Sequence, residues 1–293
     1  MERQDIQFVS QGLHCAGWFF KAQNREKAPC IVLGHGFGGT KELRLDAYAQ
    51  AFARAGYHAM VFDYRHFGDS EGEPRQILDI KKQQQDWKAA IAYARGIEGV
   101  DADKMILWGT SFSGGHVIPV AIEDGGIKAV ISQVPNLSGF ATTRATGIFQ
   151  GLRLGIAALR DRARALLGKT PYYIKIVGQP GDLAAMTAPG AYEGVLKLMP
   201  DGYIENEDVA ARIILDVSLY SPGRRASEMT MPWLVLAAQA DTTTPVWPAI
   251  KAAMKAPKGQ LIMYKSGHFD MYVPPYFDET VQDQIRFLKT NVY

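Results

Sequence analysis

Apolar residues along this chain fall into short continuous runs that alternate with longer stretches of helical period. A continuous apolar run is typical of a strand buried on both faces of a sheet, and apolar positions three and four residues apart are typical of an amphipathic helix. We expect strands at 5–10, 14–22, 28–36, 58–64, 104–109, 128–135, 233–239 and 259–265. We expect helices at 46–57, 79–97, 114–123, 243–256 and 276–292.

Strands and helices alternate in two parts of the chain, which a long segment of different character separates. Such alternation predicts a mostly parallel sheet with helices on both faces, here preceded by an antiparallel pair of strands. Residues 136–229 contain helical patterns and almost no buried-strand signal. We therefore expect one α/β core formed by residues 1–135 and 230–293, with residues 136–229 inserted after the sixth of eight strands as a helical lid.

The composition is that of an ordinary globular protein and narrows the choice of partners. The net charge is +2 over 293 residues, which gives no reason to expect nucleic acid as a partner. No signal pattern opens the chain and no apolar stretch approaches the ~18 residues of a membrane span, so we expect a soluble cytoplasmic protein without stable membrane insertion. The two cysteines, Cys15 and Cys30, lack metal-ligand spacing and are expected to be buried free thiols. We expect neither metal nor cofactor.

Two serines compete for the role of nucleophile in the pattern G-x-S-x-G. The match around Ser70, "GDSEG", is perfect, whereas "GTSFS" around Ser111 has Ser113 in place of the last glycine. A nucleophile elbow requires a buried strand before the serine, a helix after it and small residues two positions away on both sides. Ser70 lies in loop-like sequence, whereas Ser111 separates a predicted strand from a predicted helix and is flanked by Gly109 and Ser113. We predict Ser111 as the nucleophile.

A serine nucleophile needs a base, and the base needs an acid that orients it. Two histidines follow Ser111: His116 lies in a predicted helix and is expected to be structural, whereas His268 follows a predicted strand on a glycine-marked loop. Asp241 comes just after another buried strand and ahead of a helix, where it is expected to orient His268, although an Asp there could also serve as a helix cap. Asp270 is expected to stabilise the loop of His268.

The segment "GHGFGG" follows a predicted strand and supplies a second functional loop. Its position predicts that the backbone N–H of Phe37, together with that of Phe112 after the nucleophile, stabilises a developing oxyanion. It matches neither the dinucleotide nor the phosphate-binding glycine pattern. His35 is expected to brace this loop.

With these motifs in order, the chain resembles the α/β-hydrolase superfamily over nearly its full length. The motifs that carry the resemblance are "HGFGG", "FDYRHFGDSEG", "GTSFSGGH", "ADTTTP" and "GHFDMY". More narrowly, it resembles a bacterial esterase group related to dienelactone hydrolases and to a fungal polyketide acyltransferase. The resemblance implies a serine esterase that works on a small-molecule ester through an acyl-enzyme, with an acyltransferase or a non-catalytic ligand-binding protein as alternatives. The departures from the family pattern are Ser113 and Pro119, a proline inside the helix after the elbow.

One segment of the predicted lid has an apolar stripe with steps of three and four residues. Its members are Phe149, Leu152, Ile156, Leu159, Ala163 and Leu166. We expect this stripe to pack on the body of the protein, while a homodimer seam and a membrane-surface helix remain open alternatives. An apolar lid favours a partly apolar substrate of small to medium size.

Overall fold

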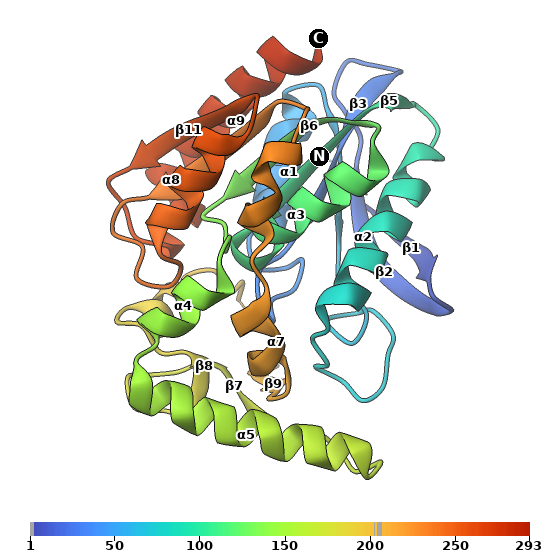
Figure 1. Cartoon of the computed structure of the whole chain (residues 1–293). Coiled ribbons are helices and arrows are strands. Elements are labelled where there is room, and N and C mark those ends of the chain that lie inside the picture. The colour runs from blue at the N-terminus through green and yellow to red at the C-terminus, as the bar shows by residue number, and fades with distance from the viewer. Residues whose placement is uncertain (1–2, 202, 204–206) are drawn as a thin grey trace.

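An eight-stranded sheet forms the centre of the molecule (Figure 1). The computed structural model describes residues 3–201, 203 and 207–293. The strands run in the order β1-β2-β4-β3-β5-β6-β10-β11, with antiparallel pairing of β1 with β2 and of β2 with β4 and parallel pairing elsewhere. Their bounds are β1 Arg3–Ser10, β2 Leu13–Phe20, β3 Ala28–Gly34, β4 His58–Phe62, β5 Val100–Thr110, β6 Ile127–Gln133, β10 Trp233–Ala238 and β11 Gly259–Tyr264. All eight predicted strands are present, and the mostly parallel sheet is confirmed.

Five helices cover the two faces of this sheet. They are α1 Leu45–Arg54, α2 Ile80–Arg95, α3 Ser111–Asp124, α8 Val246–Lys255 and α9 Tyr276–Val292. Trp87 of α2, Val117 of α3 and Ala249 of α8 share one apolar cluster on one face. Tyr48 of α1 and Phe287 of α9 belong to a second cluster on the other face. The continuous apolar runs of the central strands follow from this arrangement, because both faces of each strand are buried.

The segment between β6 and β10 leaves the central sheet and forms a separate group of elements below it in Figure 1. Its helices are α4 Gly139–Ala145, α5 Ile148–Leu166, α6 Ala191–Leu196 and α7 Ile213–Leu219. The short 3-10 helix η1 Pro222–Glu228 follows and returns the chain to the core, where it packs against α3 and α8. In addition to the expected helices the segment contains a three-stranded sheet, in the order β8-β7-β9, of β7 Tyr173–Val177, β8 Ala184–Met186 and β9 Asp208–Ala210. We call this group the insertion.

The prediction that the apolar stripe of α5 packs on the body of the protein is wrong. The buried residues of α5 are Leu154, Ala157, Ala158 and Asp161, and the stripe faces away from them. Asp161 is buried because its carboxylate pairs with the guanidinium of Arg212 and also accepts the backbone N–H groups of Tyr172 and Arg212. A count of apolar periodicity misses such a face, since only Leu154 on it is a large apolar residue and the others are two alanines and a paired carboxylate.

Both cysteine thiols are buried and free, as expected. Among the residues that the structure describes, no helix is long and apolar enough to span a membrane.

Candidate active site

Ser111 occupies the sharp turn between β5 and α3. Its φ is +53°, a left-handed conformation that is strained for a residue with a side chain. The turn is so tight that a Cβ on Gly109 would lie 2.3 Å from the carbonyl oxygen of Ser113. The carbonyl of Ser111 accepts a 2.8 Å hydrogen bond from the backbone N–H of Asn136, which ties the turn to the end of β6. The local sequence thus forms a rigid platform that presents the Ser111 hydroxyl.

His268 and Asp241 lie beside this hydroxyl. His268 follows β11, and its Nε2 is 3.2 Å from Oγ of Ser111. Asp241 follows β10, and its Oδ2 accepts a 2.6 Å hydrogen bond from Nδ1 of His268. Because parallel strands end at the same edge of the sheet, three residues far apart in sequence meet at one point.

The carboxylate of Asp241 is held by several donors at once. Its Oδ1 accepts the backbone N–H groups of Thr243 and Thr244, and its Oδ2 also accepts the hydroxyl of Thr244. Burial alone would raise the pKa of Asp241, but the charge and hydrogen bond of His268 and the hydrogen bonds of Thr244 outweigh burial and lower that pKa. Asp241 therefore stays ionised, and it organises the turn before α8 while it orients His268.

The two predicted oxyanion donors belong to different segments: Phe112 follows Ser111 in α3, and Phe37 lies in the loop after β3. Phe112 is the second residue of α3, and the first N–H groups of a helix have no intrahelical acceptor. The N–H of Phe37 makes no hydrogen bond to any other residue in the described part of the chain. A Cβ on Gly36 would lie 3.1 Å from Cβ of Ser111, so the loop that carries Phe37 rests directly on the serine. The two residues that carry the predicted oxyanion donors therefore both adjoin Ser111, and their role stays a prediction.

Ser70 lies in a different, buried environment. Its hydroxyl donates to the carbonyl of Asp63 at 2.7 Å and accepts the N–H of Ala16 at 2.9 Å. Its Oγ therefore connects β2 to the loop after β4 and has no histidine partner among the described residues. The perfect G-x-S-x-G match is a structural turn.

The other polar residues singled out in the sequence have structural contacts. His116 is fully buried between the hydroxyl of Tyr220 and the side chain of Gln83. The Nδ1 atom of His35 contacts the carbonyl of Gly36 at 3.0 Å, within the loop that it was expected to brace. Asp270 accepts the N–H of Gly267 just before His268.

Ser113 takes part in a network that the sequence analysis missed. Its Oγ lies 2.6 Å from the hydroxyl of Tyr64 and accepts from Nε1 of Trp87 at 3.2 Å. The side chain points into the protein, beneath the elbow, where a glycine would leave a gap. The only feature of the sequence that could have indicated this network is a serine where the family pattern has a glycine, with a Tyr and a Trp upstream that could reach it.

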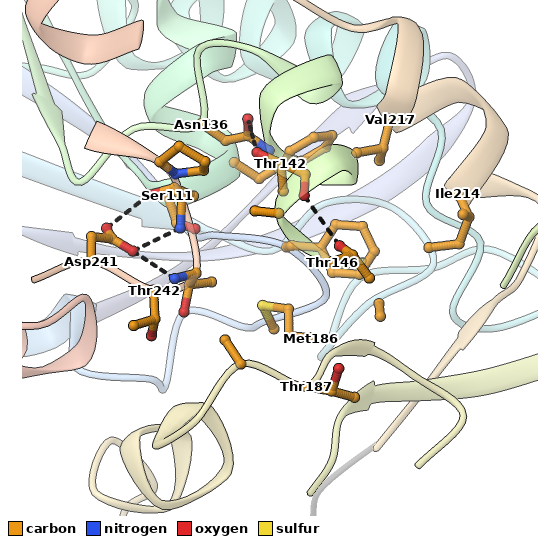
Figure 2. Close-up of a pocket in the computed structure, with 18 of the residues that line it drawn as sticks. Ser111, Asn136, Thr142, Thr146, Met186, Thr187, Ile214, Val217, Asp241 and Thr242 are labelled. Atoms are coloured by element: carbon orange, nitrogen blue, oxygen red, sulfur yellow. Dashed lines mark hydrogen bonds between the residues drawn. The ribbon is translucent and has the colours of Figure 1, made fainter. Parts of the chain in front are cut away.

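A cavity of about 540 Å³ opens beside Ser111 (Figure 2). The insertion supplies much of its wall: Thr142 of α4 and Thr146 just after that helix, the segment after β8, and α7 with Ile214 and Val217. Figure 2 shows Ser111 and Asp241 on one side of the cavity, with these two α7 residues across from them. A second cavity of about 70 Å³ also adjoins Ser111, and His268 and Leu198 are among the residues that line it.

Comparison with known proteins identifies the family and the fold of the chain. The family described as X-Pro dipeptidyl-peptidase (S15 family) matches residues 21–204. The quorum-quenching protein AidA of Acinetobacter baumannii is 43% identical over 97% of this chain and 94% of its own length. The polyketide transferase ATR5 of Stachybotrys chlorohalonatus is 31% identical over 69% of this chain and 64% of its own length.

Among solved structures, the alpha/beta hydrolase GrgF from Penicillium superposes with a TM-score of 0.84 at 22% identity, covering 100% of this chain and 99% of that one. This likeness shows the α/β-hydrolase fold. Since the family match spans more than half of the chain and one relative is 43% identical over nearly all of it, the chain belongs to the S15 family of α/β hydrolases.

Proposed function

We propose that this protein is a serine hydrolase that cleaves carboxylic esters through an acyl-enzyme intermediate. The observation that carries the proposal is the hydrogen-bonded series from Ser111 through His268 to Asp241 at the mouth of the 540 Å³ cavity. A hydroxyl becomes a competent nucleophile when a neutral imidazole accepts its proton and a carboxylate fixes the orientation of that imidazole.

The reaction proceeds in two acyl-transfer steps. Oγ of Ser111 attacks the ester carbonyl while its proton passes to Nε2 of His268, and the N–H groups of Phe37 and Phe112 stabilise the oxyanion. The protonated imidazole then gives its proton to the departing alkoxide, which leaves as the alcohol. In the second step His268 takes a proton from water, which attacks the acyl-enzyme carbonyl. The protonated imidazole then returns this proton to Oγ of Ser111 as the bond to the acyl group breaks, which releases the acid and restores the Ser111 hydroxyl.

The cavity favours a partly apolar substrate that also carries hydrogen-bonding groups. Met186, Ile214 and Val217 give it an apolar side, and Asn136 and Thr142 add polar groups. Because the insertion forms so much of the wall, it acts as a lid that selects the acyl or alcohol group. One relative bears the name of a quorum-quenching protein, so acyl lactones, which are cyclic esters, belong among the substrates to test.

The proposal is tested with two assays on wild type, Ser111→Ala and Ser70→Ala. Hydrolysis of p-nitrophenyl esters from short to long acyl chains, and of acyl lactones, should be lost in Ser111→Ala. It should persist in Ser70→Ala if that variant keeps its thermal midpoint. A fluorophosphonate probe should label one peptide, the one containing Ser111, whichever ester is the natural substrate. Labelling of another residue, or none on folded wild type, would refute the assignment of the nucleophile.

An acyltransferase with the same residues is the second candidate, favoured by the similarity to a polyketide transferase. The smaller cavity beside His268 offers a place for an alcohol or amine acceptor to replace water. Product analysis with and without acceptors separates the two functions, since a transferase forms a new ester or amide faster than it forms the free acid.

The family name suggests a dipeptidyl-peptidase activity, but these cavities offer no free carboxylate among the described lining residues to bind a peptide amino terminus. Such an enzyme must bind the charged amino terminus of a peptide, and a carboxylate is the usual partner of an ammonium group. Among the described residues that line the two cavities, Asp241 is the only carboxylate, and His268 already uses it. An X-Pro p-nitroanilide in the same assay should therefore be turned over poorly compared with esters.

A further inference from the structure

Helix α5 exposes a large apolar face at the outer edge of the insertion (Figure 1). Six large apolar residues of α5 and Leu167 just after it are 60% to 89% exposed; the six are Ile148, Phe149, Leu152, Ile156, Leu159 and Leu166. Proteins that work as monomers rarely expose a contiguous apolar patch of more than a few hundred Å². The opposite side of α5 already anchors the helix through Leu154 and Asp161, so this face is not needed to hold α5 in place.

The spacing of this face fits a second helix. Steps of three and four residues repeat without interruption along α5, which is the pattern of a coiled-coil seam. The members of the seam are Phe149, Leu152, Ile156, Leu159, Ala163 and Leu166. In an antiparallel pair with a two-fold axis at the middle of α5, Phe149 meets Leu166 of the second copy. Leu152 then meets Ala163, and Ile156 meets Leu159. Every member of the seam gains a partner, as an isologous interface requires.

The exposed area of the seam is close to that of a stable dimer. With about 200 Å² of accessible surface for each large apolar residue, the exposed fractions of the five large seam residues correspond to roughly 700 Å² per copy, and a stable interface buries about 800 Å² per partner. Gly155 lies beside Leu152 and Ile156, and no atom lies within 4 Å of a Cβ placed there. This open position allows a second helix to approach closely.

Three arginines of α5 already have partners within the insertion. Arg153 donates to the carbonyl of Gly181, and the guanidinium of Arg160 lies over the ring of Tyr172 at 4.3 Å. Arg162 forms an ion pair with Asp216. These arginines are therefore engaged by groups of their own insertion.

We infer that α5 is the seam of a homodimer in which it pairs antiparallel with α5 of a second copy of this chain. The pairing has a consequence for the site, because α5 packs against α7, whose Ile214 and Val217 line the large cavity. Dimer formation supports that wall from outside. The inference concerns assembly and stands or falls independently of the chemistry at Ser111.

The oligomeric state tests the inference directly. Sedimentation equilibrium of wild type should show a dimer at micromolar concentration. The double variant Ile156→Glu, Leu159→Glu should be monomeric, with a dissociation constant at least ~100-fold higher and an unchanged circular-dichroism spectrum. Leu219→Glu and Met254→Glu, at residues that are 83% and 80% exposed outside α5, serve as matched controls and should leave the dimer intact. A monomeric wild type, or a dimer that only the control substitutions disrupt, overturns the inference.

Cross-linking tests the direction of pairing. The native thiols are buried, so a short bismaleimide should react only with introduced cysteines. The variant Phe149→Cys, Leu166→Cys should give a covalent dimer, whereas Phe149→Cys alone should not. Cross-linking of the single variant would indicate parallel helices and overturn the proposed register. Binding of a monomeric wild type to phosphatidylglycerol vesicles, lost in the Glu double variant, would assign the face to a membrane surface and also overturn the inference.

Discussion

The hydroxyl of Ser113 lies 2.6 Å from the hydroxyl of Tyr64, and Nε1 of Trp87 donates to both oxygens. Tyr64 follows β4 and Trp87 belongs to α2, so three elements meet beneath the turn that presents Ser111. All three side chains are fully buried. A buried polar cluster of this kind is stable only when its groups satisfy one another.

Removing the Ser113 hydroxyl should therefore affect stability more than chemistry. Ser113→Ala leaves the Tyr64 hydroxyl with Trp87 as its one remaining partner, and we expect the free energy of unfolding to fall by about 1–2 kcal/mol. Because Ser113 does not touch the cavity, ester turnover per folded molecule should remain within about tenfold of wild type. Chemical denaturation and p-nitrophenyl ester kinetics measure the two effects. Ser227→Ala, at an exposed site, is the control and should change neither. A large loss of turnover with unchanged stability would contradict this role.

The sequence allowed the central sheet and the meeting of three site residues to be predicted, but not the partners of Ser113 or the orientation of α5. The central strands were predictable because each is buried on both faces, which makes its run of apolar residues continuous. The meeting of Ser111, Asp241 and His268 was predictable because each follows a strand, and strand ends converge. The partners of Ser113 were not, since they depend on where Tyr64 and Trp87 point after folding. The orientation of α5 was missed because the carboxylate of Asp161 lies on its buried side.

The orientation of His268 should depend on the negative charge of Asp241. In Asp241→Asn the amide keeps the size of the side chain but does not hold the same imidazole tautomer, so kcat should fall by about 10⁴ while KM changes little. Asp270→Asn is the matched control, two residues from His268 on the same loop, and should retain kcat within about tenfold. Steady-state kinetics with one p-nitrophenyl ester compares them. Equal losses in both variants would show that loop structure, not the charge on Asp241, limits the rate.

Buried His116 should make the stability of the protein depend on pH. Burial lowers the pKa of His116 to about 3, with a smaller contribution from the charge of His35. In the unfolded chain a histidine has a pKa of about 6.5, so the unfolded state binds the extra proton at intermediate pH. The neutral imidazole therefore contributes stability that is fully present above about pH 6.5 and is lost progressively as the pH falls toward 3.

Substitution of His116 should reduce this dependence. In His116→Gln the free energy of unfolding should decrease less steeply between about pH 6.5 and 5, by up to ~1.4 kcal/mol per pH unit. Urea denaturation across that range measures the slope. His14→Gln, on the exposed surface of β2, is the control and should keep the wild-type slope. If the slope of the variant equals that of wild type, His116 binds its proton as readily in the folded protein as in the unfolded chain, which contradicts the prediction.

The wall of the cavity formed by α7 should set the size of the acyl group. Val217 lies across the cavity from Ser111 and Asp241 (Figure 2). In Val217→Trp the larger side chain fills part of the 540 Å³, so kcat/KM for long p-nitrophenyl esters should fall by at least ~10-fold while that for the acetate ester changes by less than ~3-fold. Val217→Ala should shift the optimum toward longer chains. An equal loss on every ester would instead indicate a disturbed elbow, and an unchanged profile would place the acyl group in the smaller cavity beside His268.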